Sequence, residues 1–511
     1  MIVPLTVSDF LDRAVIAYGD RIGIIDEPDQ PAPSLGSLTY RQIGQLTQRY
    51  AAALDSLGIA PGERVAIVSH NAARLLLALY GVSGSGRVLV PINFRLHPAE
   101  IAYIVEHSGA SVLLIDPELA PALADVPFKH RAILGPESDA LLGCSQDPPK
   151  PWQRDEQATA TINYTSGTTA RPKGVQLTHR SLWLNATIFG LHSSVTDRDV
   201  YLHTLPTFHC NGWGMPFVLA AMGVKQVVLR KISGPEILRR VEAHGVTLMC
   251  AAPAVINAVL DAAQHSGKPA PGRGRVRIVV AGAPPPTRTI ERVETELGWE
   301  FLQIYGLTET SPVLTVNRGR AEWDALSPSE RAQKLSRAGA PALGVSLKID
   351  DQGEVLAQSN VVLEGYWQQP QATADALSDG WFHTGDGGTI DEEGYLTISD
   401  RKKDVIISGG ENISSIEVED ALFSHPAVAE VAVIGVPDNK WGETVKALVV
   451  LAPGKHASER ELIDHCRARL AHYKCPTSVE LRSELARTAT GKLQKFKLRA
   501  PYWEGRTRQV N

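Results

Sequence analysis

Hydrophobic and polar positions along most of the chain repeat with two alternating periods. Apolar residues three to four positions apart indicate helices, and short apolar runs rich in β-branched residues indicate buried strands. The clearest helix is 39–57, in which Ile43, Leu46, Ala51 and Leu54 fall near one face and Gly58 marks the end. Further helices are predicted at 71–82, 98–108, 181–189, 212–222 and 235–244, and strands at 64–68, 88–90, 111–115, 201–205, 225–229, 248–251 and 275–281. Strands that alternate with helices predict an α/β fold with a mostly parallel sheet.

The pattern changes in the second half of the chain. Residues 317–339 are charged and polar and predict an excursion with a short helix, whereas 353–398 are rich in strands and turns. The charged run 400–404 precedes a separate α+β pattern, with helices at 416–423 and 458–470 and strands at 428–436 and 446–451. We therefore predict two domains, 1–402 and 403–511.

Composition narrows the class of protein. Of the 511 residues, 43% are hydrophobic and 21% charged, as expected for a globular protein with a sizeable core. The net charge of −5 argues against a nucleic-acid surface. Asp9, Asp12 and Arg13 lie where a signal peptide needs an apolar core, and no apolar run reaches membrane-spanning length, so we expect a cytoplasmic protein. The five cysteines are scattered without metal-type spacing, which favours buried thiols in a reducing compartment: Cys144, Cys210, Cys250, Cys466 and Cys475.

The stretch 161–177, TINYTSGTTARPKGVQL, predicts a strand, a loop of small hydroxyl residues and glycine, and a return strand. Converging backbone N–H groups, hydroxyls and the charge of Lys173 favour an oxyanion such as a polyphosphate. A Walker A loop is excluded, because its lysine precedes Ser or Thr at a helix start, whereas Lys173 lies between Pro172 and Gly174. The alternative is an ordinary Gly/Thr-rich turn.

Two other polar pieces follow predicted strands. The first is 282–284, Gly-Ala-Pro, and the second is 305–309, Tyr-Gly-Leu-Thr-Glu. Ligands of open parallel sheets bind at the carboxyl ends of the strands. We therefore expect these pieces and the 165–174 loop to surround one ligand.

Four longer motifs identify a family. YTSGTTARPKGV, QIYGLTET, WFHTGDGGTIDEEGYLTISDRKKDVIISGGENI and RTATGKLQKFKLR occur in this order. They resemble the signatures of the adenylate-forming superfamily, which includes acyl-CoA synthetases, peptide-synthetase adenylation domains and firefly-type luciferases. The likeness covers nearly the whole chain and is closest to the fatty- and aryl-acyl-CoA synthetases. It implies a large ATP- and acyl-binding domain of stacked, mostly parallel sheets with a small β-rich subdomain, followed by a small, mobile α+β domain.

The resemblance also implies a reaction. A carboxylate attacks the α-phosphate of ATP, pyrophosphate leaves, and the acyl-adenylate is then converted to a thioester with coenzyme A. Mg²⁺ would be bound by Glu309, Thr308 would contact the α-phosphate, and Lys492 would reach it from the small domain. The remaining residues expected at the nucleotide are Thr165, Ser166, Gly167, Thr168, Thr169 and Lys173 at the phosphates, Gly282, Ala283, Pro284, Tyr305 and Gly306 around the adenine, and Asp386 and Arg401 at the ribose.

The thiol and the acid have their own expected residues. By resemblance, Lys403 is the hinge about which the small domain turns, and Gly409, Gly410 and Glu411 line the thiol tunnel. In the matching segment FHCNGWG, His209 replaces the aspartate with which peptide-type relatives bind an amine, so amino acids are not the expected substrates. His209, Trp213 and Gly306 are expected at the acid, and His209 is also counted among the catalytic residues. The expected acid is medium- or long-chain fatty, aryl or bulky cyclic.

Each residue also has a structural alternative. Lys492 alone could be a surface lysine, Asp386 a turn aspartate, Glu309 a helix-start carboxylate and Trp213 a core residue. The phosphate loop departs from the family pattern at Ala170, where glycine is usual. The ribose motif departs from it at Gly388, and the C-terminal motif lacks a proline before Arg487. None of these departures removes a functional side chain.

Three functions remain open on this evidence. The first is an ATP-dependent carboxylic acid–CoA ligase. The second is an enzyme that passes the adenylate to a carrier-protein thiol or a partner enzyme, and the third is a non-catalytic nucleotide or acyl binder. Relatives are often homodimers, and the sequence leaves the oligomeric state open.

Overall fold

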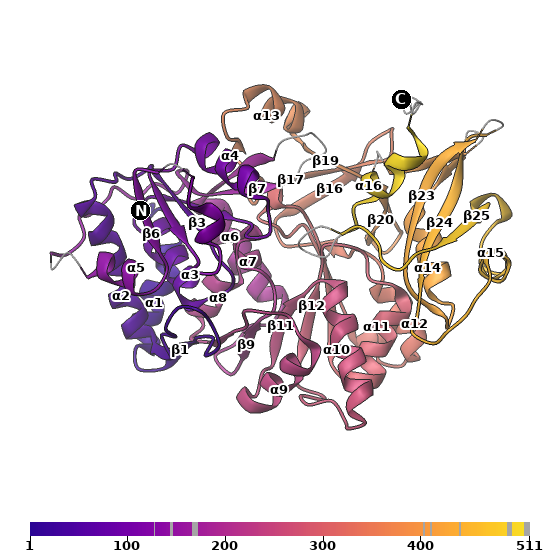
Figure 1. Cartoon of the computed structure of the whole chain (residues 1–511), viewed down its shortest axis with the longest axis horizontal. Helices are drawn as coiled ribbons and strands as arrows, with labels where there is room; N and C mark the ends of the chain where they lie inside the picture. The colour runs from indigo at the N-terminus through magenta and orange to yellow at the C-terminus, as the bar shows by residue number, and fades with distance from the viewer. Residues whose placement is uncertain are drawn as a thin grey trace.

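The computed structural model describes residues 1–126, 128–143, 147–165, 172–401, 404–408, 411–438, 441–487 and 493–504, with only the backbone of residues 400, 401 and 412. A large α/β part precedes a small part with its own sheet, drawn in orange and yellow at the right of Figure 1. No helix within the described ranges is both long and apolar enough to cross a membrane.

The largest sheet, sheet A, is built on parallel strands. Strands β9 to β13 that neighbour each other pair in parallel, as the alternation of helices and strands predicts. Among the described residues its order is β15 (Ala340–Pro341), β14 (Thr315–Arg318), β13 (Glu300–Tyr305), β12 (Arg277–Val280), β11 (Leu248–Ala251), β9 (Val200–His203), β10 (Lys225–Val228), β1 (Ile22–Ile25) and β2 (Ser37–Thr39).

The second sheet of the large part, sheet B, carries the 161–177 hairpin at one side. Its strands β4, β3, β5 and β6 pair in parallel, and β7 pairs with β8 in antiparallel fashion. The described order is β18 (Gly365–Tyr366), β8 (Lys173–Thr178), β7 (Thr159–Thr165), β4 (Val88–Ile92), β3 (Arg64–Val68), β5 (Val112–Ile115) and β6 (His130–Ile133).

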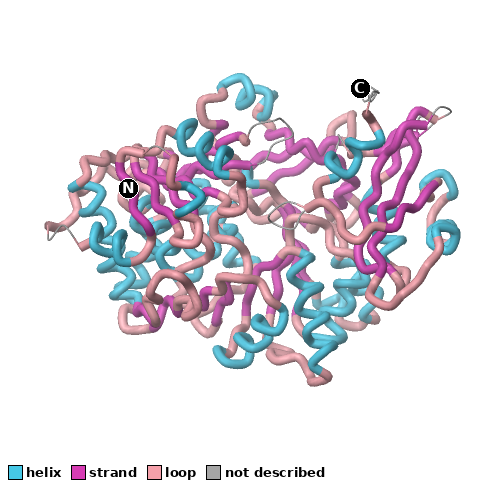
Figure 2. The backbone as a smooth tube through the Cα atoms, in the orientation of Figure 1, coloured by secondary structure: helices cyan, strands magenta, loops and turns pink. Residues whose placement is uncertain are grey.

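Consecutive residues of these strands enter different cores, as the period of two requires. Val65 and Ile67 of β3 belong to the core shared by sheets A and B, whereas Ala66 and Val68 belong to a core on the outer face of sheet B. Helices cover both faces of the sheets (Figure 2). The helices of the large part are α1 (Ser8–Tyr18), α2 (Tyr40–Ser56), α3 (Ala73–Ala78), α4 (Pro98–Ser108), α5 (Pro136–Leu142), α6 (His179–His192), α7 (Cys210–Trp213), α8 (Met215–Ala221), α9 (Gly234–His244), α10 (Pro253–Ser266), α11 (Thr287–Arg292), α12 (Pro328–Leu335) and α13 (Pro370–Ala376).

A small antiparallel sheet, sheet C, completes the large part. Its described order is β16 (Val345–Ile349), β17 (Glu354–Ser359), β19 (Phe382–Ile390) and β20 (Leu396–Arg401). Strands β17 and β19 lie within the β-rich region predicted at 353–398 and β20 starts within it, whereas β16 precedes it.

The C-terminal part has its own cores on the two faces of sheet D, and these contain only residues from Ile406 onward. Its described strands are β21 (Ile406–Ser408), β22 (Glu411–Ile413), β23 (Val428–Asp438), β24 (Gly442–Leu451) and β25 (Ser478–Leu481), and its helices are α14 (Ser415–Phe423), α15 (Glu459–Arg467) and α16 (Lys495–Arg499). The predicted small α+β domain is therefore present at the C-terminus, with cores of its own. A boundary at residue 403 stays a prediction, because residues 402 and 403 lie outside the described residues.

Most predicted elements are present within a few residues of their expected bounds. The predicted helix 39–57 is α2, and Thr39 caps its N-terminus. The Thr39 hydroxyl accepts from the backbone N–H of Gln42, and the Gln42 side chain accepts from the backbone N–H of Thr39. The prediction of a single helix at 212–222 is wrong. Only Met215–Ala221 is a right-handed helix, and the residues before it form a left-handed turn, described below.

Candidate active site

The 161–177 hairpin fixes both ends of the predicted phosphate loop. Strands β7 and β8 pair from Thr161 opposite Leu177 to Thr165 opposite Lys173. The loop between them, with Ser166, Gly167, Thr168 and Thr169, lies outside the described residues. Thr165 and Lys173 are therefore held as neighbours by the last pair of the ladder.

The other two predicted pieces lie at one edge of sheet A, because β12 and β13 are parallel neighbours. Gly282, two residues beyond β12, has a φ of +93°. Ala283 is half-buried and Pro284 exposed. Beyond β13, Gly306 passes so close to the Pro312 carbonyl oxygen that a Cβ would lie 1.6 Å from it. Thr308 is buried and Glu309 half-buried in a single 3₁₀ turn, Thr308–Thr310.

The residues predicted at the adenine and the ribose contact each other. The Tyr305 hydroxyl donates to Asp386 Oδ2 at 2.8 Å. Asp386 is only 4% exposed, and its Cα partner across β19 and β20 is Arg401. The antiparallel pairing thus places the two predicted ribose residues side by side on adjacent strands.

One residue that the motifs did not single out joins the two sheets at this point. Tyr366 of β18 lies beside the hairpin, opposite Val175. The Lys173 ammonium lies 4.7 Å from the centre of its ring, and its hydroxyl donates to Glu309 Oε1 at 3.0 Å. The lysine of sheet B and the carboxylate of sheet A therefore meet at the same side chain.

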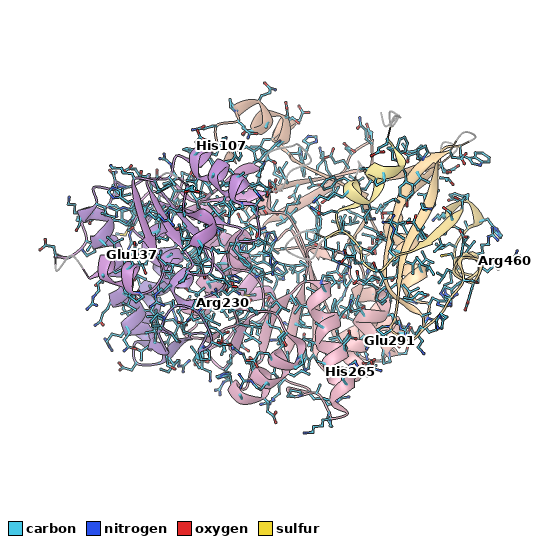
Figure 3. The ribbon with its side chains drawn as sticks, in the orientation of Figure 1. His107, Glu137, Arg230, His265, Glu291 and Arg460 are labelled. Atoms are coloured by element: carbon cyan, nitrogen blue, oxygen red, sulfur yellow. The ribbon has the colours of Figure 1, made fainter. Side chains whose placement is uncertain are left out.

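A hydrogen-bond network around His107 connects α4 to strand β7 and to the end of strand β18 at this site. The ring of His107, at the end of α4 (Figure 3), forms a 2.8 Å hydrogen bond with the hydroxyl of Tyr164 on β7. Its carbonyl oxygen accepts from the indole of Trp367, the residue after Tyr366. Burial lowers the pKa of His107 and raises that of Tyr164. Both side chains are therefore neutral at pH 7, so the network adds no charge next to the phosphate loop.

The segment predicted to contact the acid has an unusual backbone. Cys210, Asn211, Gly212, Trp213 and Gly214 all have positive φ, from +45° to +77°, which makes a left-handed turn. All five are buried, and the Trp213 indole, 3% exposed, belongs to the main core.

Side chains of β7 hold this turn. The Asn211 side-chain amide donates to Thr161 Oγ1 at 2.9 Å and to Asn163 Oδ1 at 3.2 Å. The Asn163 amide in turn donates to the Phe208 carbonyl oxygen at 3.4 Å. The expected acid segment is thus attached to the strand that leads into the phosphate loop.

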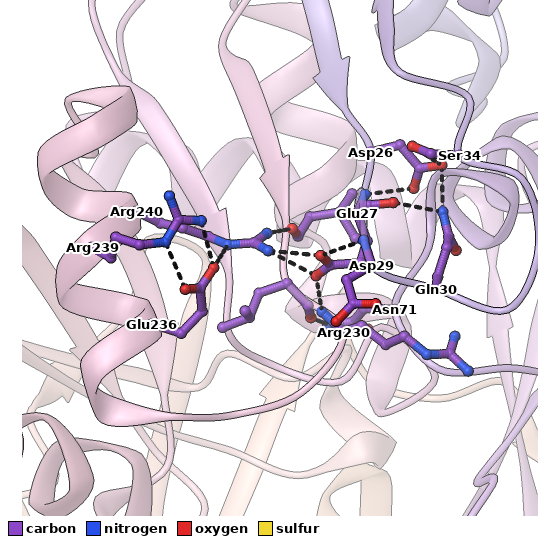
Figure 4. A network of polar contacts seen from close by, with 12 residues as sticks. Asp26, Glu27, Asp29, Gln30, Ser34, Asn71, Arg230, Glu236, Arg239 and Arg240 are labelled. Atoms are coloured by element: carbon purple, nitrogen blue, oxygen red, sulfur yellow. Dashed lines mark hydrogen bonds and ion pairs between the residues drawn. The ribbon is translucent and has the colours of Figure 1, made fainter.

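A second polar cluster holds the chain just before this segment (Figure 4). Asn71 Oδ1 accepts from the Thr207 N–H at 2.8 Å, and its amide donates to the His203 and Leu205 carbonyl oxygens. Glu27 accepts from the Arg230 backbone N–H at 3.0 Å and pairs with the Arg240 guanidinium at 2.8 Å. Asn71 follows β3 of sheet B and Glu27 follows β1, so these buried contacts attach the end of β9 to sheet B and the end of β10 to the chain after β1.

Buried charges near this cluster are paired. The Arg230 guanidinium makes two 2.8 Å hydrogen bonds to Asp116. Burial raises the pKa of Asp116, but the Arg230 hydrogen bonds outweigh it and the pKa is lowered overall. Burial and the neighbouring Glu309 raise the pKa of the Cys210 thiol, so this cysteine is neutral and packs as a small apolar group.

The donor set fits a hard divalent cation carried by a phosphate. Within the described residues no cluster of three or more His, Cys, Asp or Glu side chains could hold a metal ion by itself. Mg²⁺ characteristically takes one or two carboxylates and completes its shell with phosphate oxygens and water. Glu309, half-buried and hydrogen-bonded by Tyr366, whose ring lies against Lys173, offers such a carboxylate.

Several predicted residues are not placed by the structure. Lys403, Gly409, Gly410 and Lys492 lie outside the described residues, as does the side chain of Arg401. Glu411 is described: it is exposed on β22, opposite Ser408. His209, half-buried, stands at the start of the left-handed turn.

Comparison with solved structures defines the class. The fold is that of adenylate-forming enzymes: o-succinylbenzoate coenzyme A synthetase of Bacillus subtilis in complex with AMP superposes with a TM-score of 0.81 at 30% identity, covering 96% of this chain and 97% of the other. An anthranilate CoA ligase in complex with anthranoyl-AMP gives a TM-score of 0.87 at 26% identity, covering 98% of each chain.

The family follows from the sequence. Residues 11–367 match the AMP-binding enzyme family, and 417–492 match the AMP-binding enzyme C-terminal domain. Similar proteins include 2-methylpropanoate–CoA ligase of Humulus lupulus, 36% identical over 97% of this chain and 95% of that protein. 4-Hydroxybutyrate–CoA ligase 2 of Metallosphaera sedula is also 36% identical, over 97% and 94%. The chain belongs to the AMP-binding enzyme family, and its enzyme class is that of the AMP-forming acid–CoA ligases.

Proposed function

We propose that this enzyme joins a compact carboxylic acid, short and branched or aryl, to coenzyme A through an acyl-adenylate. The observation that supports this most is the meeting of Lys173 of sheet B and Glu309 at Tyr366, together with the hydrogen bond from Tyr305, at the end of β13 of sheet A, to Asp386 of sheet C. A cation, a metal-binding carboxylate and an aromatic–carboxylate pair suit the phosphates, metal and nucleoside of ATP.

The first step makes the acid reactive. A carboxylate oxygen attacks the α-phosphorus, the bond to the β-phosphate oxygen breaks, and pyrophosphate leaves. Charge builds up on phosphate oxygens, so the protein contributes mainly position and positive charge. Lys173 and Thr165 would hold the β- and γ-phosphates and Thr308 the α-phosphate. Mg²⁺ held by Glu309 would neutralise phosphate charge.

The second step needs a thiol and the small domain. Lys492 would stabilise the charge of the first step, and the small domain would then turn about Lys403 so that Gly409, Gly410 and Glu411 meet pantetheine. Free coenzyme A is the proposed acceptor, because the two relatives named above are CoA ligases and this chain matches them over nearly their whole lengths. A carrier-protein thiol is the alternative acceptor.

The size of the acid is argued from the left-handed turn. From Thr207 to Gly214 only His209 is not fully buried, so His209 is the side chain of this segment that can contact an acid. The Trp213 indole fills space within the core, which leaves less room for the medium- or long-chain fatty acid or bulky cyclic acid that the sequence led us to expect. The proposal therefore replaces that expectation with a compact acid and keeps only the aryl class from it. Phe208 packs edge-on against Phe94, which stacks on His70, so an aromatic wall adjoins the segment.

The test is product analysis by mass spectrometry with ATP, Mg²⁺, coenzyme A and a panel of acids. The panel contains 2-methylpropanoate, 4-hydroxybutyrate, anthranilate, octanoate and palmitate. We expect an acyl-CoA and an equal amount of AMP from a short or aryl acid, and much less product from palmitate. Acyl-adenylate without thioester would favour the carrier-protein alternative, and no ATP consumption with any acid would contradict the proposal.

A further inference from the structure

We propose that Tyr366 is a positioning residue that sets the phosphate-loop lysine and the metal-binding carboxylate in place together. The inference rests on the proposed function, because the roles of Lys173 toward phosphate and Glu309 toward Mg²⁺ belong to that proposal. Tyr366 itself touches neither reacting atom; it acts through its two charged neighbours.

The two charges use different parts of the same side chain. The Lys173 ammonium lies over the face of the ring, 4.7 Å from its centre, where the negative face of the π-system attracts a cation. Glu309 Oε1 accepts from the hydroxyl at the edge of the ring, 3.0 Å away. A carboxylate has about four lone-pair directions, so one hydrogen bond orients Glu309 and leaves other directions for a cation.

The backbone around Tyr366 is fixed on both sides. Its N–H donates to Thr373 Oγ1 at 2.9 Å, and the Trp367 N–H donates to the Gly174 carbonyl oxygen at 2.7 Å. The Leu363 N–H donates to the Glu309 carbonyl oxygen at 2.7 Å. One short segment, 363–367, is therefore attached both to the return strand of the phosphate loop and to the turn that carries Glu309.

This arrangement prepares the site before ATP arrives. A carboxylate or lysine that is already oriented loses less conformational freedom on binding its ligand. Side chains that orient a metal ligand matter in metalloproteins generally: their removal typically weakens metal binding by about 10- to 100-fold. The hydroxyl of Tyr366 should therefore affect Mg²⁺, and its ring should affect the phosphates.

Two substitutions separate the contribution of the Tyr366 hydroxyl from that of the ring. Tyr366→Phe removes the hydrogen bond to Glu309 and keeps the face on which Lys173 lies, whereas Tyr366→Leu removes both. Tyr502→Phe is the matched control, because the Tyr502 hydroxyl also donates to a glutamate, Glu480, but within the small domain. ATP binding is measured by calorimetry in EDTA and at increasing Mg²⁺, together with the melting temperature.

We expect Tyr366→Phe to raise the Mg²⁺ concentration needed for half-maximal enhancement of ATP binding by about tenfold, with ATP binding in EDTA unchanged. Excess Mg²⁺ should restore its binding and activity. Tyr366→Leu should in addition weaken ATP binding in EDTA by about threefold, and Tyr502→Phe should change neither. In a Glu309→Gln background, Tyr366→Phe should have no further effect on Mg²⁺.

An unchanged Mg²⁺ midpoint in Tyr366→Phe would overturn the inference. So would equal losses in EDTA and in Mg²⁺ accompanied by a lower melting temperature, because these would mark Tyr366 as a packing residue. The binding arms need neither acid nor coenzyme A. They therefore decide the role of Tyr366 even if every acid fails as a substrate, which would count against the proposed function instead.

Discussion

Gly306 and Gly282 follow neighbouring strands of the site and are glycines for different reasons. A Cβ on Gly306 would lie 1.6 Å from the Pro312 carbonyl oxygen, a distance that the backbone of the 306–312 turn could relieve only by moving. Gly282 has open space around its Cβ position but a φ of +93°. The first glycine is required by close approach and the second by backbone conformation.

These two reasons predict different losses of stability and of AMP binding when each glycine is replaced by alanine. Gly306→Ala should lower the free energy of unfolding by at least about 2 kcal/mol and abolish measurable AMP binding, because the turn carrying Thr308 and Glu309 must shift. Gly282→Ala should cost about 1 kcal/mol and keep AMP binding within a few-fold. Urea unfolding and calorimetry with AMP measure both. Equal effects of the two substitutions would contradict this explanation.

Two buried histidines make stability depend on pH. Burial lowers the pKa of His203 from 6.5 to about 4, against a smaller opposing effect of the Gln226 hydrogen bond, and burial lowers that of His179 to about 4 as well. Between these values the unfolded chain binds protons that the folded chain does not. The unfolding free energy is therefore highest above pH 6.5 and falls as the pH drops toward 4.

At pH 5 we expect each histidine to have cost about 2 kcal/mol relative to pH 7.5. His179→Asn keeps an acceptor for the Val7 N–H, which His179 Nδ1 accepts at 3.3 Å, but cannot titrate. Its unfolding free energy, measured in urea at both pH values, should fall by about 2 kcal/mol less than that of the unsubstituted protein. An identical fall in the two proteins would show that His179 is not involved.

At the scale of elements, residues 210–214 form a left-handed turn, a backbone conformation that residues with a Cβ disfavour. Left-handed backbone costs roughly 1–2 kcal/mol for each residue with a Cβ, and Cys210 and Trp213 have no side-chain amide to offset it. The Asn211 amide, hydrogen-bonded to Thr161 and Asn163 of β7, supplies a specific attachment. Strain of this kind is characteristic of functional segments.

This attachment predicts coupling between a strand and a loop. Asn163→Ala and Asn211→Gly should each lower the unfolding free energy by about 1–3 kcal/mol, since a buried amide loses its partner. The double variant should cost about 1 kcal/mol less than the sum. Asn163→Ala combined with Asn317→Ala, a buried asparagine bonded to Lys334 and Arg337 carbonyl oxygens, should be additive. Additivity in both pairs would contradict the attachment.

The same elements show what the sequence can reveal. Helix α2 was predictable because its apolar face, its capping residue and its terminal glycine all lie within the helix or next to it. The turn at 210–214 was not, because the residues that hold it belong to β7, about fifty positions earlier. Asn211 and two glycines close together give a local signal for left-handed backbone, but they do not show what it packs against.

The site residues also differ in whether the sequence alone could identify them. Lys173, Glu309, Tyr305 and Asp386 were found through motifs, and the structure places Lys173 and Glu309 on one tyrosine and Tyr305 on Asp386. Tyr366 was missed because its partner Glu309 is 57 residues away and because it lies in none of the four motifs. Its role depends on the pairing of β18 with β8, which only the folded chain displays.

At the scale of the whole molecule, polar groups on α14 and just before it connect the described part of the small domain to the large one. Asp420 of α14 accepts from the backbone N–H of Thr287, at the start of α11, at 2.9 Å and from its hydroxyl at 3.2 Å. Ser414, which caps α14, hydrogen-bonds the Ser399 carbonyl oxygen in β20. Separate hydrophobic cores suit two domains that change their relative position between two half-reactions.

The most direct test of the central claim follows the oxygen atoms of the acid. The enzyme is incubated with ATP, Mg²⁺, coenzyme A and an acid labelled with ¹⁸O at both carboxylate oxygens, and the AMP and pyrophosphate are analysed by mass spectrometry. If the carboxylate attacks the α-phosphorus and the thiol then breaks the acyl–oxygen bond, each AMP formed carries one ¹⁸O and the pyrophosphate carries none. Label in pyrophosphate or inorganic phosphate, or thioester formed with unlabelled AMP, would contradict the account.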